Sequence, residues 1–199
     1  QPASRVQCWR ICRLLIRPLS RRLSRPNRCV CTTLARWTSS RNWTLPTPSL
    51  VTGALSLANG TAGTSTIQGG GTINAKGGAS FPGGGTELLI GRVLNLGDGT
   101  GTAVTATWTA GGFQVAAGAV INNRSNSTFT TTHDGIFHNT RSSTGGTINN
   151  EGIFTKNGGT GSTSVGSPFS RSGPVDFNNS GTVNVNTGTL QFIDSYTQT

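Results

Sequence analysis

The stretch "FNNSGTVNVNTGTLQF", residues 177–192, indicates the fold of this chain more clearly than any other. Val183 and Val185 alternate with polar residues, and strand side chains point alternately to two faces. The pattern therefore predicts a strand with one apolar and one polar face. Leu190 and Phe192 repeat the alternation after an Asn-Thr-Gly turn. An isolated hairpin would explain this stretch equally well, so the rest of the chain has to decide.

Dipeptides of an apolar residue and asparagine recur along the chain. Each follows a glycine by a few residues, and the last three belong to "INN", "INN" and "FNN". Intervals of 21, 27, 27 and 29 residues separate the asparagines, which is the range of one solenoid coil. The predicted fold is all-β, a parallel β-helix (β-solenoid). Its structural repeat anchors are Asn74, Asn95, Asn122, Asn149 and Asn178.

The overall composition agrees with a solenoid. The chain of 199 residues has 29 Gly, is 33% hydrophobic and is only 11% charged, which is low for an ordinary globular enzyme. Glycine interrupts nearly every helix-forming run after residue 50. No stretch of eighteen apolar residues occurs, so we expect no membrane span.

The composition changes sharply near residue 47. Residues 1–46 hold ten of the arginines and all four cysteines, and they contain no glycine and no acidic residue. The net charge of +10 belongs to this segment, because the remainder sums to zero. We therefore expect two parts: a basic segment, 1–46, that is not integral to the fold, and a solenoid region, 47–199. The strand pattern is cut at its end, which suggests a fragment of a longer array.

Several interpretations of the basic segment compete. Clustered arginine suits a nucleic-acid or membrane-surface arm, and an Arg- and Ser-rich stretch without acids suits a transit peptide. A zinc site at Cys8, Cys12, Cys29 and Cys31 lacks the usual ligand spacing. The favoured interpretation is a disordered or out-of-frame segment, because it has no periodicity and ends abruptly. No specific nucleic-acid partner is expected.

Residues 50–199 resemble the repeats of large bacterial surface and secreted proteins. The resemblance is carried by "GTINNEGIFTKNGG" and "FNNSGTVNVNTGTLQF", and the proteins are of the autotransporter-passenger and filamentous-haemagglutinin-like kind. It implies a right-handed parallel β-helix with structural or adhesive roles at an extracellular or cell-surface location. The partners it implies are surface glycans, host or matrix components, and adjacent repeats of the same chain.

Catalysis is the main alternative, because parallel β-helices also carry polysaccharide lyases and glycosidases. Their chemistry requires paired carboxylates. Measured from the anchors, no acid shares its phase with an acid of the next coil. We therefore predict no catalytic residue, no enzyme activity and no cofactor here; the alternative is a carbohydrate-active β-helix whose catalytic coils lie elsewhere. The six acids are Glu87, Asp98, Asp134, Glu151, Asp176 and Asp194.

The local cluster "HDGIFH" is the one stretch with metal-ligand residue types. His133, Asp134 and His138 could ligate a metal. However, the Asp-Gly pair is a strong turn signal, and histidines five apart lie on opposite faces of a straight strand. No metal site is therefore expected.

Threonine-rich stretches raise a third possibility, the binding of ice or another crystal surface. "TATWT" at 105–109 and "TFTTT" at 128–132 would need threonines at one phase in successive coils. Two residues before the anchors no such ladder exists, because valines and an aspartate interrupt it. The positions are Thr72, Val93, Val120, Thr147 and Asp176.

The repeat register itself makes a prediction. If Asn122 and Asn149 stack in adjacent coils, Arg124 and Glu151 must be neighbours of opposite charge. An exposed pair of this kind stabilises by about 0.2–1 kcal/mol and can favour one register over a slipped one.

Overall fold

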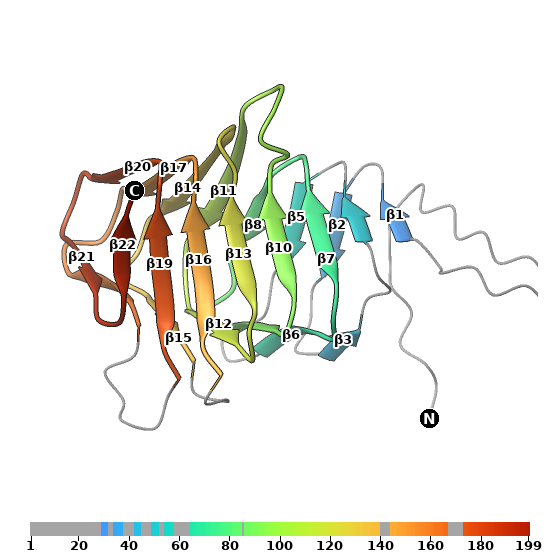
Figure 1. Ribbon diagram of the computed structural model, residues 1–199, viewed down its shortest axis with the longest axis horizontal. Helices are drawn as coiled ribbons and strands as arrows, with labels where there is room; N and C mark the ends of the chain where they lie inside the picture. The colour runs from blue at the N-terminus through green and yellow to red at the C-terminus, as the bar shows by residue number, and fades with distance from the viewer. Residues whose placement is uncertain are drawn as a thin grey trace, which may run out of the picture.

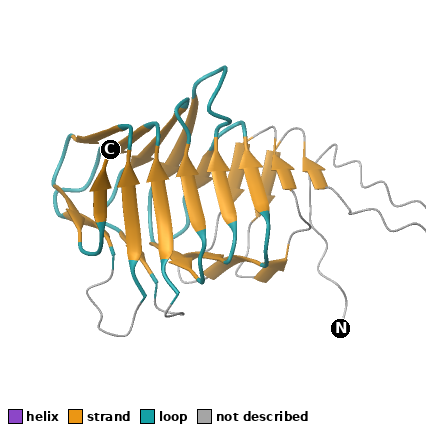
Figure 2. Ribbon diagram, viewed as in Figure 1, coloured by secondary structure: helices purple, strands orange, loops and turns teal. Residues whose placement is uncertain are grey.

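The computed structural model describes residues 29–31, 34–37, 42–44, 49–51, 54–57, 64–84, 86–139, 144–166 and 173–199. Within these residues every regular element is a strand and none is a helix (Figure 2). The strands form three sheets that run along the long axis of the molecule (Figure 1). No helix in this part of the chain has the length and apolar character needed to cross a membrane.

The first sheet has eight strands: β1 (Cys29–Cys31), β4 (Ser49–Val51), β7 (Thr72–Ala75), β10 (Val93–Leu96), β13 (Val120–Asn123), β16 (Gly146–Asn150), β19 (Val175–Asn179) and β22 (Tyr196–Gln198). The second has seven: β2 (Leu34–Trp37), β5 (Ala54–Leu57), β8 (Ala79–Phe81), β11 (Val104–Trp108), β14 (Ser127–Thr131), β17 (Ile153–Lys156) and β20 (Thr182–Val185). The third also has seven: β3 (Asn42–Thr44), β6 (Thr64–Gln68), β9 (Thr86–Ile90), β12 (Gly112–Ala116), β15 (Ile136–His138), β18 (Ser162–Val165) and β21 (Thr189–Phe192).

Strand pairing shows that each coil consists of three strands. Every strand pairs in parallel with the strand three places earlier, three places later, or both, so successive coils stack (Figure 1). In the first sheet Asn95 lies opposite both Asn74 and Asn122, and Asn149 lies opposite both Asn122 and Asn178. The predicted all-β parallel solenoid is confirmed, and the 27-residue interval is one turn.

Three short strands precede the composition break at residue 47. β1 pairs with β4, β2 with β5, and β3 with β6, all in parallel. These pairings place three strands of residues 1–46 in the solenoid sheets, although the composition predicts a segment that is not integral to the fold. The physical reason is that ladder pairing uses the backbone, which is indifferent to net charge and to a lack of glycine. Residues 1–28, with Cys8 and Cys12, lie outside the described residues.

The core is a narrow column of side chains enclosed by the three sheets. Inward residues alternate with outward ones along the strands, as in β13 and β14. Aromatic rings stack from coil to coil: the Phe129 and Phe154 rings are 5.2 Å apart and nearly parallel, and Phe177 meets Phe154 edge-on at 5.3 Å. Phe154 is 1% exposed. This column fixes which face of each strand points to solvent, and so positions the surface rows described next.

Glycine permits the close approach of coils at one corner in particular. A Cβ on Gly152, in the turn between β16 and β17, would collide with the backbone oxygens of Arg124 and Ser127 in the preceding coil. Only glycine fits that turn without moving the coil beneath it.

Candidate functional site

The five asparagine anchors form one continuous row on the outer face of the first sheet. From Asn95 onward, the Nδ2 of each anchor donates to the Oδ1 of the anchor in the preceding coil, at 2.7 Å from Asn95 to Asn74 and from Asn122 to Asn95, 2.8 Å from Asn149 to Asn122, and 2.9 Å from Asn178 to Asn149. Such ladders arise because strands about 4.8 Å apart hold equivalent side chains within reach. In this outer asparagine row, Asn95, Asn122 and Asn149 thereby each use one donor and one acceptor of the carboxamide. Asn178 is its exposed end.

A second, buried asparagine row lies at the adjacent corner of the coils. Asn123 Nδ2 donates to Asn150 Oδ1 at 2.6 Å, and Asn150 Nδ2 donates to Asn179 Oδ1 at 2.6 Å. Each Nδ2 also reaches a backbone carbonyl, that of Ile153 or Thr182 in these two cases. The inner asparagine row begins at Asn123 because Leu96 occupies the equivalent position one coil earlier.

Sequence reasoning missed the inner row. The doubled asparagine of "INN", "INN" and "FNN" contained the signal, since adjacent strand residues face opposite ways. If the first asparagine points outward, the second must point inward. A buried carboxamide must then find partners, and the equivalent carboxamides of the neighbouring coils supply them.

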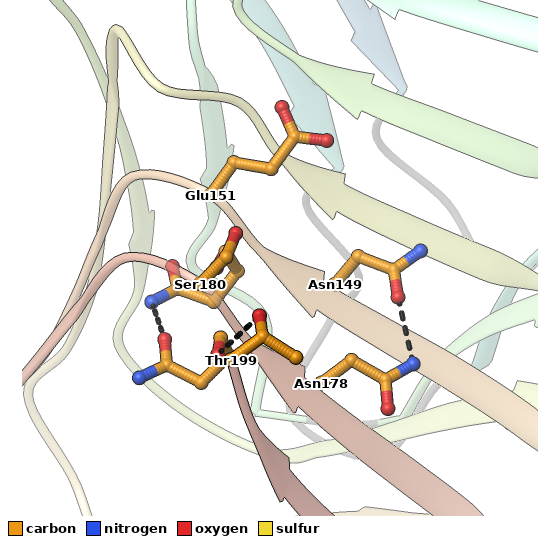
Figure 3. Close-up of a pocket in the computed structure, with 7 residues that line it drawn as sticks. Asn149, Glu151, Asn178, Ser180 and Thr199 are labelled. Carbon is orange, nitrogen blue, oxygen red and sulfur yellow. Dashed lines mark hydrogen bonds between the residues drawn. The ribbon is translucent and has the colours of Figure 1, made fainter.

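A shallow hollow lies where the two rows approach each other, at the turns after β16 and β19 (Figure 3). Its volume is about 200 Å³, below the usual range of about 300–1,000 Å³ for small-molecule pockets. Its lining is polar and comes from adjacent coils: Asn149, Asn150, Glu151, Asn178, Asn179, Ser180 and Thr199. The hollow presents carboxamides, hydroxyls and a carboxylate, groups that hydrogen-bond to hydroxyl-rich ligands.

The predicted contact between Arg124 and Glu151 is confirmed. Arg124 Nη1 donates to Glu151 Oε1 at 2.8 Å, and each side chain is about one third exposed. In Figure 3 the Glu151 side chain extends away from the amides of Asn149 and Asn178. The ion pair therefore sits at the rim of the hollow and holds the carboxylate in place.

Asp98, Asp134, Glu151 and Asp194 bind cations, amides or backbone rather than one another. Asp98 Oδ1 accepts from Thr100 N at 3.0 Å and from Asn126 Nδ2 at 3.1 Å, so the stretch "GDGTG", residues 97–101, forms a corner between coils. The Thr100 amide lowers the pKa of Asp98. Asp194 Oδ2 accepts from Val175 N at 2.8 Å. The side chain of Glu87 lies outside the described residues.

The residues of "HDGIFH" are separated by their contacts. The His133 ring packs edge-on against Trp108 at 4.4 Å, with Nε2 3.0 Å from Gly111 O. His138 lies 3.3 Å from Ile136 O through Nδ1, and burial lowers its pKa. Asp134 instead binds Lys156. Within the part of the chain that the structure describes, no three His, Cys, Asp or Glu side chains gather as a set of metal ligands.

The pair of Asp134 and Lys156 is a structural ion pair with a predictable pH dependence. Lys156 is fully buried, and its Nζ donates to Asp134 Oδ1 and to Gly158 O, both at 2.8 Å. The hydrogen bond from Lys156 and that from Gly161 N hold the pKa of Asp134 below its ordinary value. A carboxyl with a lowered pKa stabilises the fold above its unfolded pKa, about 3.9, and loses that effect as the pH falls through the folded value.

We therefore expect Asp134→Asn to lower the melting temperature by several degrees at neutral pH, because the buried Lys156 ammonium loses its counterion. The difference from the unchanged chain should begin to shrink below about pH 4, where Asp134 is protonated in the unfolded state, and should vanish once the pH falls below the lowered pKa of the folded state. Melting curves from pH 2 to 7 measure this. A difference that stays constant across that range would contradict it.

Comparison of the chain with protein-family models, with curated proteins and with solved structures found no match. The fold and the geometry of its surface rows are therefore the basis for assigning a role.

Proposed function

We propose that this chain is a structural and adhesive segment of a secreted or cell-surface bacterial protein, and that it binds surface glycans. The observation that carries the proposal is the hollow at the end of the outer asparagine row. There Asn149, Asn178 and Ser180 come from two adjacent coils beside Glu151. A sugar ring presents several hydroxyls that both donate and accept hydrogen bonds, and carboxamides do the same. A hollow of about 200 Å³ suits one such ring.

The scaffold supports a passive role of this kind. Stacked coils hold the row rigidly, and the outer asparagines are already positioned by their mutual hydrogen bonds, so little ordering entropy is lost when a ligand binds. The resemblance to bacterial surface repeats favours the same role. A single shallow hollow gives weak affinity, and many copies on one surface convert weak contacts into adhesion.

The test is a glycan array probed with the full chain coupled to beads. We expect binding to a subset of glycans, weakened about tenfold by Asn178→Ala, which removes one hydrogen-bonding group from the hollow. The matched control is Asn186→Ala: Asn186 is also exposed, and it also donates to a neighbour, Asn157 Oδ1, at 3.0 Å. It lies outside the hollow and should have no effect.

Two outcomes would contradict the proposal. The first is no binding to any glycan, and the second is an equal loss with both variants. Release of new reducing ends from a bound polysaccharide would instead favour the carbohydrate-active alternative. Loss of that release in Glu151→Gln would identify Glu151 as the catalytic acid.

A further inference from the structure

The outer face of the second sheet carries a two-dimensional array of threonines. Thr105 pairs with Thr128 and Thr107 with Thr130 between β11 and β14. The pairing continues through β17 and β20, where the fifth and sixth threonines are Thr155 and Thr182. Ile153 and Asn184 fill the remaining two positions. We call this array the threonine face: Thr105, Thr107, Thr128, Thr130, Ile153, Thr155, Thr182 and Asn184.

The array lies in the second sheet, whereas the sequence prediction concerned positions of the first sheet, two residues before the anchors. No threonine ladder exists two residues before the anchors, as expected, since Val93 pairs with Val120 there. The stretches "TATWT" and "TFTTT" belong to a different sheet, and they stack in register. One of the rows extends further with hydroxyl residues, because Thr107 pairs with Ser80 and Ser80 with Ser56.

The threonine hydroxyls remain available to solvent, unlike the asparagine amides. Neighbours along a row are about 4.8 Å apart and successive outward residues of one strand about 6.7 Å apart, which is too far for hydroxyls to bond one another. Among the described residues, none of the six threonine hydroxyls has a hydrogen-bond partner in the protein, whereas the outer asparagines are bonded to each other. The face also contains no charged residue.

The face is rigid because its inward neighbours fill the core. Ala106, Phe129 and Phe154 alternate with the residues of the face and are buried. The rings of Phe129 and Phe154 stack on each other between adjacent coils. The spacing of the array is therefore fixed by the strand repeat in one direction and by the pleat in the other. A ligand that recognises the whole face must itself be periodic in two dimensions.

We propose that the threonine face binds ice. The surface of ice presents rows of water oxygens with a rectangular repeat of similar size, and each threonine offers one hydroxyl to donate and accept and one methyl to fill the space between waters. Uncharged side chains suit this ligand, since charged groups hold a strong hydration shell of their own. Each contact is weak, and the sum over a rigid array makes the binding effectively irreversible on a growing crystal.

This inference does not depend on the glycan-binding proposal. The threonine face belongs to the second sheet, and the hollow is lined by the ends of first-sheet strands and their turns. A chain that binds no glycan can still bind ice, and the reverse also holds.

The test is the partition of the full chain into a slowly growing ice hemisphere, together with thermal hysteresis. We expect the unchanged chain to enter the ice, and Thr130→Lys to lower hysteresis by about tenfold or more, because a charge there interrupts the row of Thr107, Thr130 and Thr155 at the middle of the array. Thr105→Lys, at an exposed position, gives a second variant whose folding is at little risk. Thr130→Val and Thr130→Ser separate the contributions of hydroxyl and methyl.

The matched control is Ser164→Lys, an outward and half-buried position of the third sheet. Circular dichroism melting checks that each variant is folded. Exclusion of the unchanged chain from ice, at the level of an inert protein of equal size, would overturn the proposal. An equal loss of hysteresis in folded Ser164→Lys and Thr105→Lys would overturn it as well.

Discussion

Replacing Phe154 with alanine is expected to lower the free energy of unfolding by about 3–5 kcal/mol, the usual cost of truncating a buried phenylalanine. The ring of Phe154 is surrounded by those of Phe129 at 5.2 Å, Phe177 at 5.3 Å and Phe137 at 6.2 Å. Three coils meet at this point, so the cavity cannot be closed by moving one of them. Urea unfolding followed by circular dichroism measures the change.

The neighbouring residue provides the control. Ile153 belongs to the same strand, points to the opposite face and is 39% exposed. Ile153→Ala should cost less than about 1 kcal/mol, because little apolar surface is lost from the core. Comparable losses for the two variants would show that β17 is turned over, with its apolar residues on the wrong face.

Replacing Asn150 with alanine is expected to lower the free energy of unfolding by about 2–4 kcal/mol. The change removes the donor to Asn179 Oδ1 and Thr182 O and the acceptor of Asn123 Nδ2. A buried polar group without a partner costs about 1–3 kcal/mol, and at least one such group remains here. The alanine also leaves a void in the inner asparagine row.

Asn149→Ala is the matched control, one residue away in the outer asparagine row. Its partners Asn122 and Asn178 are half-buried and exposed, so water can replace the lost hydrogen bonds. We expect a loss below about 1 kcal/mol. Urea midpoints of the two variants at one temperature decide the comparison. If Asn149→Ala were the more damaging, the outer row rather than the inner would stabilise the coils.

The first sheet could be predicted in register, whereas the other two could not. The reason is physical: the apolar-Asn dipeptide occurs at the same position of each coil, so the interval from one anchor to the next is one full turn of the solenoid. Thr107 and Thr130 carry no comparable mark, since threonine is common in this chain and the loops before β11 and β14 differ in length. The threonine face therefore emerged only when the strands were placed.

The candidate site was predicted in part for a similar reason. Asn149 and Asn178 were identified as anchors from their spacing, and their stacking follows from it. The hollow depends on turns, whose course is set by the packing of Gly152 and Gly181 against the coil below. Local sequence does not specify that packing. The pairing of β1, β2 and β3 was not predicted, because residues 1–46 are rich in arginine and lack the periodicity that indicates strands.

The pairing of every strand with only its counterparts in the adjacent coils has a consequence for how such a protein can change over evolutionary time. Val93, Val120 and Thr147 lie opposite one another at a constant offset of 27 residues. Loss or duplication of a 27-residue unit would therefore join strand ends that already match, and the remaining coils would keep their neighbours. The number of coils, and with it the length of the molecule, can therefore change by whole units while the core of the remaining coils stays the same.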